Sequence, residues 1–171
     1  MAIIRSLRGF TPQIGENCFL AENAAIIGEV TMGRDCSIWY SATLRGDVNP
    51  IILGDGVNIQ DGSVLHTLHN ESVVRIGNYV SIGHNVTLHG CQIDDNVLIG
   101  MGAVVLDYVH VGEGAIVAAG SVVLSKTQIP PHELWGGVPA KFIKKVSPET
   151  AEIWNKGNAK HYIEYAKWYE E

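Results

Sequence analysis

Three histidines, His66, His84 and His89, have the residue type and the spacing to hold a metal ion. Neutral imidazoles are common zinc ligands, and a set of three leaves one position of a tetrahedral ion open. In catalytic sites of that kind the pKa of the bound water falls towards about 7, so hydroxide is available at neutral pH. The stretch that carries these histidines, residues 65–90, therefore predicts a metal site suited to attack on a small electrophilic carbon.

The elements that position the histidines follow from a six-residue repeat. Aliphatic residues or methionine occupy nineteen successive repeat positions, with two insertions and one deletion between them. A period of six fits neither an α-helix nor an alternating strand, and glycine often follows the aliphatic residue. Each unit is therefore predicted to be a short strand and a tight corner. The nineteen positions are Ile14, Leu20, Ile26, Met32, Ile38, Leu44, Leu53, Ile59, Leu65, Ile76, Ile82, Leu88, Ile93, Ile99, Val105, Val111, Val117, Val123 and Ile129.

Three units make one triangular coil, and coils stack through parallel backbone hydrogen bonds about 4.8 Å apart. The repeat predicts a mainly β protein, a parallel β-helix of about six coils. After Ile129, two prolines and a Gly-Gly pair end it. Ser147 as an N-cap before a proline predicts a C-terminal α-helix over residues 147–171, packed on residues 1–146 in a single domain. Its predicted packing stripe is Ala151, Trp154, Asn158, Tyr162, Tyr165 and Tyr169.

The repeat also predicts how the histidines lie. His66 and His89 directly follow core positions that are one coil apart, so both should point outward with Cα atoms about 4.8 Å apart. His84 lies at a corner, and the five extended residues between it and His89 span up to about 16 Å. One ion cannot bridge that distance. Either His84 is unrelated to the other two histidines, or a second copy of the chain places its own His84 corner against the face that carries His66 and His89. Such a contact between two different surfaces must close into a ring to be finite, and a triangular prism suggests a ring of three copies.

Two columns of polar residues favour the second interpretation. Arg45 occupies the repeat position one coil before His66, and Asp61 occupies the position one coil before His84. If corner meets face, Arg45 of one chain faces Asp61 of the next in an ion pair. Gln60 would point outward near the same interface.

Three segments carry a resemblance to a known family. The sequences RGD at residues 45–47, NIQDGSVLHT at residues 58–67 and IGHNVTLHG at residues 82–90 resemble those of the γ-class carbonic anhydrases, a family of hexapeptide-repeat proteins. The resemblance implies a left-handed β-helix, a homotrimer and reversible hydration of carbon dioxide to bicarbonate. It also implies a metal at each trimer interface, with zinc expected and Fe2+ or Co2+ compatible with the same ligands.

The resemblance also implies roles for three groups of residues. The metal ligands would be His66 and His89 of one chain with His84 of its neighbour. The polar interface residues would be Arg45, Asp47 and Asp61. The catalytic residues would be Gln60, which bonds the metal-bound water, Asn58, which lines the substrate pocket, and Tyr162 on the final helix.

The chain departs from the family pattern in two places. Val48 stands where the family has a glutamate, and Glu71 is the only carboxylate in the loop after His66. A metal hydroxide regenerates only if protons reach solvent, so a missing shuttle would limit turnover while sparing metal binding.

Composition excludes some classes of function. The formal net charge is −6, and no basic stripe is present to neutralise the phosphates of a nucleic acid. No apolar run approaches the roughly 20 residues of a membrane span, and no secretory signal is recognisable, so we expect a cytoplasmic protein.

Two alternatives to a carbonic anhydrase remain open. An acyl-CoA-dependent hexapeptide acyltransferase would need only one interface histidine, and usually an extended loop or a separate acceptor domain. A non-catalytic scaffold subunit would retain the metal as a clip between chains.

Overall fold

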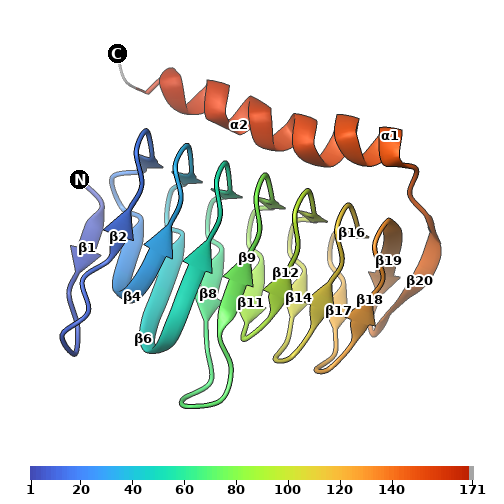
Figure 1. Cartoon of the computed structure of the whole chain (residues 1–171), viewed down its shortest axis with the longest axis horizontal. Coiled ribbons are helices and arrows are strands. Elements are labelled where there is room, and N and C mark those ends of the chain that lie inside the picture. Colours follow the sequence, from blue (N-terminus) through green and yellow to red (C-terminus); the bar gives the residue numbers. More distant parts are fainter. Residues whose placement is uncertain (170–171) are drawn as a thin grey trace.

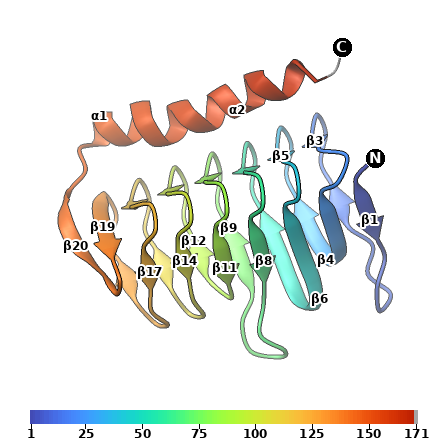
Figure 2. The same cartoon turned by 180° about the vertical axis from the view of Figure 1, so that it is seen from behind.

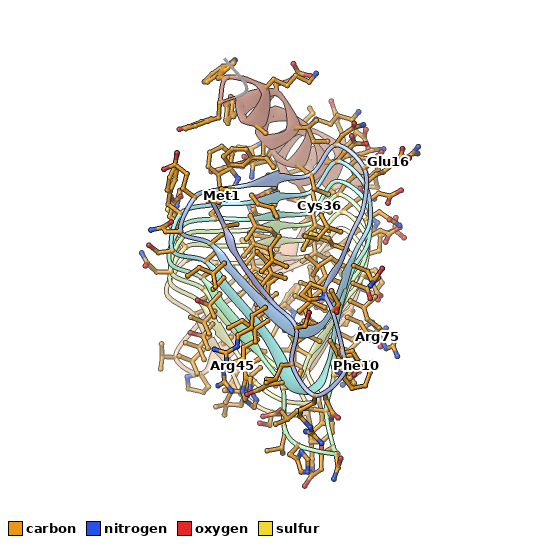
Figure 3. The ribbon with its side chains drawn as sticks, turned by 90° about the vertical axis from the view of Figure 1, so that its left-hand side faces the viewer. Met1, Phe10, Glu16, Cys36, Arg45 and Arg75 are labelled. Atoms are coloured by element: carbon orange, nitrogen blue, oxygen red, sulfur yellow. The ribbon has the colours of Figure 1, made fainter. Side chains whose placement is uncertain are left out.

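The computed structural model, which describes residues 1–169, is a parallel β-helix with one helical segment along its side (Figures 1 and 2). Short strands form three faces around a common axis, here named face A, face B and face C in chain order. Along that axis the chain encloses a triangular core, with Cys36 inside it and Arg45 on the outer surface (Figure 3). The predicted fold class is confirmed.

The strands divide among the faces as follows. Face A contains β2 (Gln13–Ile14), β9 (Val74–Ile76), β12 (Gln92–Ile93), β15 (His110–Val111) and β18 (Gln128–Ile129). Face B contains β3 (Phe19–Leu20), β5 (Ser37–Ile38), β7 (Asn58–Ile59), β10 (Ser81–Ile82), β13 (Leu98–Ile99), β16 (Ile116–Val117) and β19 (Glu133–Gly137). Face C contains β1 (Ile3–Arg5), β8 (Val64–His66), β11 (Thr87–His89), β14 (Val104–Val105) and β17 (Val122–Val123). Two longer strands, β4 (Ala25–Met32) and β6 (Thr43–Leu53), bend around the corner between faces C and A and contribute to both.

Face B shows the number of turns. It holds seven parallel strands within residues 1–169, so the chain makes about seven turns where the repeat predicts about six. The added strand is β19, in which Trp135 pairs with Val117 of β16. Because Trp135 takes a place that the repeat fills with an aliphatic residue, the sequence pattern stops one turn early. The strand β20 (Ala140–Lys145) then pairs antiparallel with β19.

The repeat positions form the core of the β-helix. All nineteen are buried except Ile14 and Leu20, which lie in the first turn and are half-buried. Because side chains alternate along a strand, the residue after a core position points outward. This alternation carries His66 and His89 from the core positions before them to the outer surface of face C.

Leu88→Ala is expected to lower the free energy of unfolding by about 2–5 kcal/mol. Leu88 is fully buried and stacks between Leu65 and Val105 of the adjacent turns, so its loss leaves a cavity. The matched control is Leu124→Ala, whose side chain is half exposed and whose cost should stay within about 0.5 kcal/mol. Urea unfolding followed by circular dichroism compares the two variants. Equal losses would contradict the prediction.

A helical segment follows the β-helix. It consists of α1 (Pro148–Thr150), a π-helical stretch η1 (Ala151–Lys156) and α2 (Gly157–Lys167). Ser147 caps it as predicted, since its hydroxyl oxygen accepts the backbone N–H of Thr150 at 3.1 Å. The predicted helix covers residues 147–171, of which 170 and 171 lie outside the described residues. No helix within residues 1–169 is long and apolar enough to cross a membrane.

The helix packs over face B largely through small residues. Ala159 is buried, and the buried amide of Asn155 donates to three backbone carbonyls, with the shortest contact 2.9 Å to Asn96. The predicted stripe is wrong at Trp154 and Tyr165, which are 65% and 36% exposed, because the helix turns Asn155, Ala159 and Ala166 towards the strands instead. It holds at Tyr162, whose ring meets Trp39 edge-on with centroids 5.4 Å apart.

Candidate metal centre

His66 and His89 lie side by side on face C. The strands β8 and β11 pair in parallel and bring the two residues into register. His66 Nδ1 faces His89 Nε2 at 3.2 Å, with both side chains partly buried. Two Zn–N bonds of about 2.0–2.1 Å in a tetrahedral arrangement place their nitrogens about 3.3 Å apart. The pair therefore fits two ligand positions of a zinc ion.

The remaining ring nitrogen of each of these histidines meets a carboxylate. His66 Nε2 lies 2.9 Å from Asp47 Oδ1, and Asp47 also pairs with Arg45. His89 Nδ1 lies 2.9 Å from each oxygen of Asp107. Ionised carboxylates only accept hydrogen bonds, so in neutral imidazoles these contacts favour protons on the outer nitrogens and leave the two facing nitrogens able to bind a metal. Such outer contacts orient histidine ligands in many metal sites.

Both carboxylates are held in the ionised form. Burial acts to raise the pKa of Asp47, but hydrogen bonds from Arg45 and His66 outweigh it and leave the pKa below its ordinary value. At Asp107, burial again acts to raise the pKa, and hydrogen bonds from Ser72 and His89 outweigh it. Near neutral pH each aspartate therefore accepts the histidine N–H as an anion.

Sequence reasoning did not identify Asp107. It follows the core residue Val105 by two positions, at the corner one turn beyond Gly90, so it is not in the column of His66 and His89. Gly90 makes the contact possible, because a Cβ there would collide with Ser72 Oγ and Asp107 Oδ1. In the sequence, Gly90 directly after His89 was the one feature that indicated a side chain of another turn packed against this corner.

His84 lies apart from this pair. It follows β10 at the corner between faces B and C, and its Nδ1 lies 2.9 Å from Asp61 Oδ2 of the same chain. Its side chain is 40% exposed. Within residues 1–169, no group of three or more histidine, cysteine, aspartate or glutamate side chains is placed to hold a metal. A single chain thus supplies two adjacent imidazoles and presents the third elsewhere.

The residues predicted to form an interface ion pair each have a partner within the chain. Arg45 bonds Asp47, and Asp61 bonds His84. Each aspartate thereby holds one predicted metal ligand. The pairing of Arg45 with Asp61 of a neighbouring chain stays a prediction.

Two of the three predicted catalytic residues, Gln60 and Tyr162, lie around His84. Gln60, His84 and Tyr162 line a cavity of about 320 Å³ between face B and α2. Gln60 donates to Asn58 Oδ1 at 3.0 Å, and Asn58 in turn donates to Ser81 Oγ at 2.8 Å. Asn58 is fully buried beneath Gln60 and so positions the glutamine rather than lining the cavity.

Tyr162 also borders a second cavity, of about 240 Å³, together with Asp61, His84 and Trp39. Burial, followed by the negative charge of Asp61, raises the pKa of the Tyr162 hydroxyl above its ordinary value. The hydroxyl therefore keeps its proton near neutral pH and can donate a hydrogen bond into this region.

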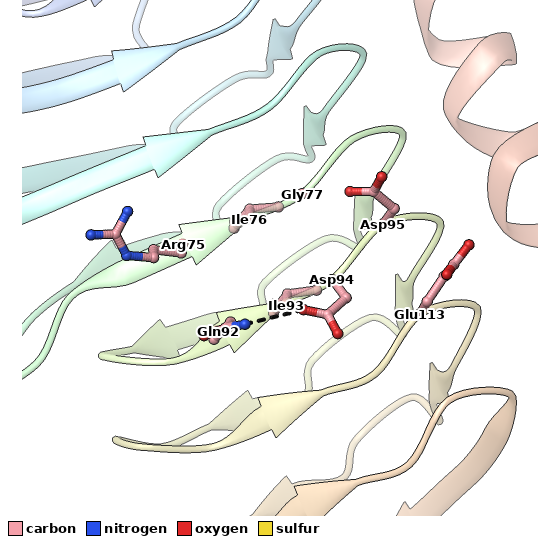
Figure 4. Close-up of a pocket in the computed structure, with 8 residues that line it drawn as sticks. All are labelled: Arg75, Ile76, Gly77, Gln92, Ile93, Asp94, Asp95 and Glu113. Carbon is pink, nitrogen blue, oxygen red and sulfur yellow. Dashed lines mark hydrogen bonds between the residues drawn. The ribbon is translucent and has the colours of Figure 1, made fainter.

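Another cavity, of about 410 Å³, lies at the edge of face A and contains none of the predicted site residues (Figure 4). Asp94, Asp95 and Glu113 give it an acidic lining. None of the three predicted metal ligands lines this cavity.

Known proteins resemble this chain along most of its length. The bacterial transferase hexapeptide (six repeats) family model matches residues 90–125. A carbonic anhydrase of Geobacillus kaustophilus is 38% identical over 167 residues, covering 98% of this chain and 91% of the relative. The mitochondrial γ carbonic anhydrase 2 of Arabidopsis thaliana is 42% identical over 162 residues, covering 92% of this chain. The chain spans only 58% of that plant relative's length.

A solved structure shares the whole architecture. The Bacillus cereus protein, described as a putative acetyltransferase, is 38% identical with a TM-score of 0.94, covering 98% of this chain and 96% of that one. Membership of a carbonic anhydrase family implies a metal cofactor in general, and the paired imidazoles suit one. From the repeat, the stacked histidines and these relatives together, the chain belongs to the γ-class carbonic anhydrase-like family of hexapeptide-repeat proteins.

Proposed function

We propose that this protein is a metal-dependent γ-carbonic anhydrase that reversibly hydrates carbon dioxide to bicarbonate. The observation that carries the proposal is the His66–His89 pair, whose facing nitrogens lie 3.2 Å apart while aspartates hold the opposite nitrogens. Zinc bound by three histidines would supply a hydroxide nucleophile at neutral pH. Fe2+ and Co2+ suit the same donors.

The third ligand would be His84 of a neighbouring chain in a homotrimer. His84 lies on a corner and His66 on a face, so the contact between copies joins two different surfaces. Such a contact must close into a ring to be finite, and three copies close around a triangular prism. Arg45, Asp47 and Asp61 would then lie at the same interface. There Asp47 would contact His66, and Asp61 would contact His84.

Gln60 would orient the attacking water. Its amide group is buried and tied through Asn58 to Ser81, so its direction is set before substrate arrives. Tyr162 and Trp39 would shield the region from bulk solvent, since their rings pack edge-on above it.

Proton export would limit turnover in this chain. Glu71, the only carboxylate in the loop after His66, accepts the hydroxyl of Tyr108 at 2.8 Å. That contact ties Glu71 to Tyr108 at the corner of the next turn, rather than to His66 or His89. Added buffer would then carry protons to solvent, so we expect turnover to rise with buffer concentration.

The test is to purify the protein anaerobically and to load it separately with zinc, iron and cobalt. Carbon dioxide hydration, metal per chain and mass by light scattering are then measured together. We expect one metal per chain and a mass about three times the 18.6 kDa of one chain. Hydration at background level with all three metals would overturn the proposal. Metal retained by an inactive trimer would instead favour a scaffold subunit.

A second candidate is an acyl-CoA-dependent acyltransferase, because the Bacillus cereus structure at 38% identity is described as a putative acetyltransferase. An acyltransferase needs only one histidine as general base, whereas here two histidines face each other and each contacts an aspartate. We therefore expect no consumption of acetyl-CoA with small amine or hydroxyl acceptors. Turnover of acetyl-CoA above the hydrolysis background would favour the acyltransferase.

A further inference from the structure

Asp107 contacts the predicted metal ligand His89 from outside the repeat column that holds His66 and His89. Both of its carboxylate oxygens lie 2.9 Å from His89 Nδ1. Ser72 Oγ donates to the same carboxylate at 2.7 Å, which fixes its orientation. The Asp107 side chain is about as buried as Asp47, at 20% and 22% exposure. Two neighbouring histidines thus have matching carboxylate partners on opposite sides.

The chemistry of the contact depends on which ring nitrogen carries the proton. A neutral imidazole has one N–H, and only its other nitrogen can bind a metal. A carboxylate beside Nδ1 accepts and never donates, so it favours the form with the proton on Nδ1. His89 Nε2, which faces His66, then keeps its lone pair free for the metal.

The loop after His66 is built into this arrangement. Asn49 Nδ2 donates to the backbone oxygens of Leu68 and Ser72, at 2.9 and 2.8 Å, and holds the loop against the turn before it. Ser72 then reaches across to Asp107, in a space that Gly90 leaves open. The position of the loop therefore sets the position of the carboxylate.

We propose that Asp107 is a positioning residue that fixes His89 in its metal-binding tautomer, and that Ser72 couples the loop of residues 67–73 to metal affinity. The proposal rests on the proposed function in that it takes His89 as a metal ligand. Asp107 touches neither substrate nor metal and acts through His89 alone.

The test compares Asp107→Asn with a matched control elsewhere in the same chain. Asparagine keeps the shape of aspartate, but its amide group can donate to Nδ1 and so favour the wrong tautomer. Asp94→Asn is the control, because Asp94 Oδ2 lies 2.8 Å from His110 Nε2 on face A. Asp94 lines the acidic cavity (Figure 4), which contains none of the predicted metal ligands. The two variants make the same chemical change at two histidine–aspartate pairs.

The first readout is zinc affinity, measured by competition with a chromophoric chelator at fixed pH. We expect Asp107→Asn to weaken binding about 10–100-fold, as other outer contacts of metal ligands do, and Asp94→Asn to leave it unchanged. Ser72→Ala should weaken zinc binding by a smaller factor in the same direction. Equal zinc affinity in wild type and Asp107→Asn would overturn the proposal.

The second readout needs no metal. Nitrogen NMR of the metal-free protein above the histidine titration range reports the tautomer of each ring. We expect His89 to carry its proton on Nδ1 in wild type and to shift towards Nε2 in Asp107→Asn. An unchanged tautomer would also overturn the proposal.

These readouts separate the proposal from the proposed function. If wild type carries the Nδ1–H tautomer but binds no zinc, the metal-dependent function fails while the aspartate's effect on the ring stands. If wild type binds zinc and Asp107→Asn binds it equally well, the function stands and the positioning role falls. Should Asp107→Asn fail to fold, Ser72→Ala carries both measurements. Wild-type affinity and tautomer in that variant would then count against the proposal.

Discussion

His84→Ala is expected to abolish retention of zinc, although His84 has no contact with His66 or His89 in its own chain. Structural zinc sites bind with about 10–16 kcal/mol shared among their ligands, so losing one ligand costs about 3–4 kcal/mol. That cost corresponds to a loss of affinity of roughly 100–1,000-fold. Metal content after dialysis against a weak chelator measures it. His110→Ala, which removes a histidine of face A paired with Asp94, should retain metal as wild type does.

Mixing two inactive variants gives a sharper test of the shared site. His84→Ala chains keep the His66–His89 pair, and His66→Ala chains keep His84. If each site joins the pair of one chain to His84 of the next, every mixed trimer contains one intact site of its three. Random assembly of equal amounts makes about three quarters of the trimers mixed, so zinc content and activity should return to about one quarter of wild type.

The outcome of the mixing experiment also excludes other arrangements. Recovery requires that the subunits exchange, so the variants are unfolded and refolded together, with separately refolded variants as the control. No recovery after verified exchange would contradict a site built across two chains. Full metal content in His84→Ala alone would show that His84 is not a ligand.

The pairing of His66 with His89 could be predicted from sequence because it follows from period and register alone. Once the repeat is recognised, residues one coil apart must stack, and the residue after a core position must point outward. The structure pairs His89 with His66 in that register. No rotamer or side-chain contact enters that reasoning.

The partners of the histidines could not be predicted in the same way. Asp107 reaches His89 from a corner, where the direction of the side chain depends on the turn and on the empty space at Gly90. Arg45 bends back to Asp47, two residues along its own strand, although its column suggested a partner in another chain. A side chain can contact a neighbour in its own strand or a residue of another chain. The repeat period does not predict which of these contacts forms.

The helix shows a similar limit. An aromatic stripe at helical spacing predicted its buried face, but Asn155 and Ala159 lie against the strands and Trp154 faces outward. The reason is local. Backbone carbonyls that the helix covers at the turns of the β-helix need donors, and the Asn155 amide donates to those of Asn96, Gly114 and Ala115. The spacing of apolar residues does not predict which polar side chain will bond these carbonyls.

Gln60→Ala is expected to slow carbon dioxide hydration by about 10–100-fold while metal content and trimer mass stay at wild-type values. The physical reason is orientation. Asn58 and Ser81 hold the Gln60 amide in one direction beside His84, and alanine would remove the hydrogen-bond partner that we propose for the attacking water. Stopped-flow hydration in strong buffer measures the effect without interference from proton export. Gln92→Ala, an exposed glutamine on face A, is the matched control and should hydrate at the wild-type rate.

A second variant decides whether Gln60 acts by orientation or only fills space. Ser81→Ala leaves the glutamine in place but frees Asn58, so the amide that Asn58 positions loses its fixed direction. We expect a smaller fall in rate than for Gln60→Ala, again with metal retained. If both variants hydrate carbon dioxide at the wild-type rate, Gln60 only packs against the helix. The choice between enzyme and scaffold would then rest on the metal-loaded assays alone. If both variants instead lose metal, the hydrogen bonds that link Gln60, Asn58 and Ser81 hold His84 in position at the interface. Gln60 would then affect catalysis only indirectly.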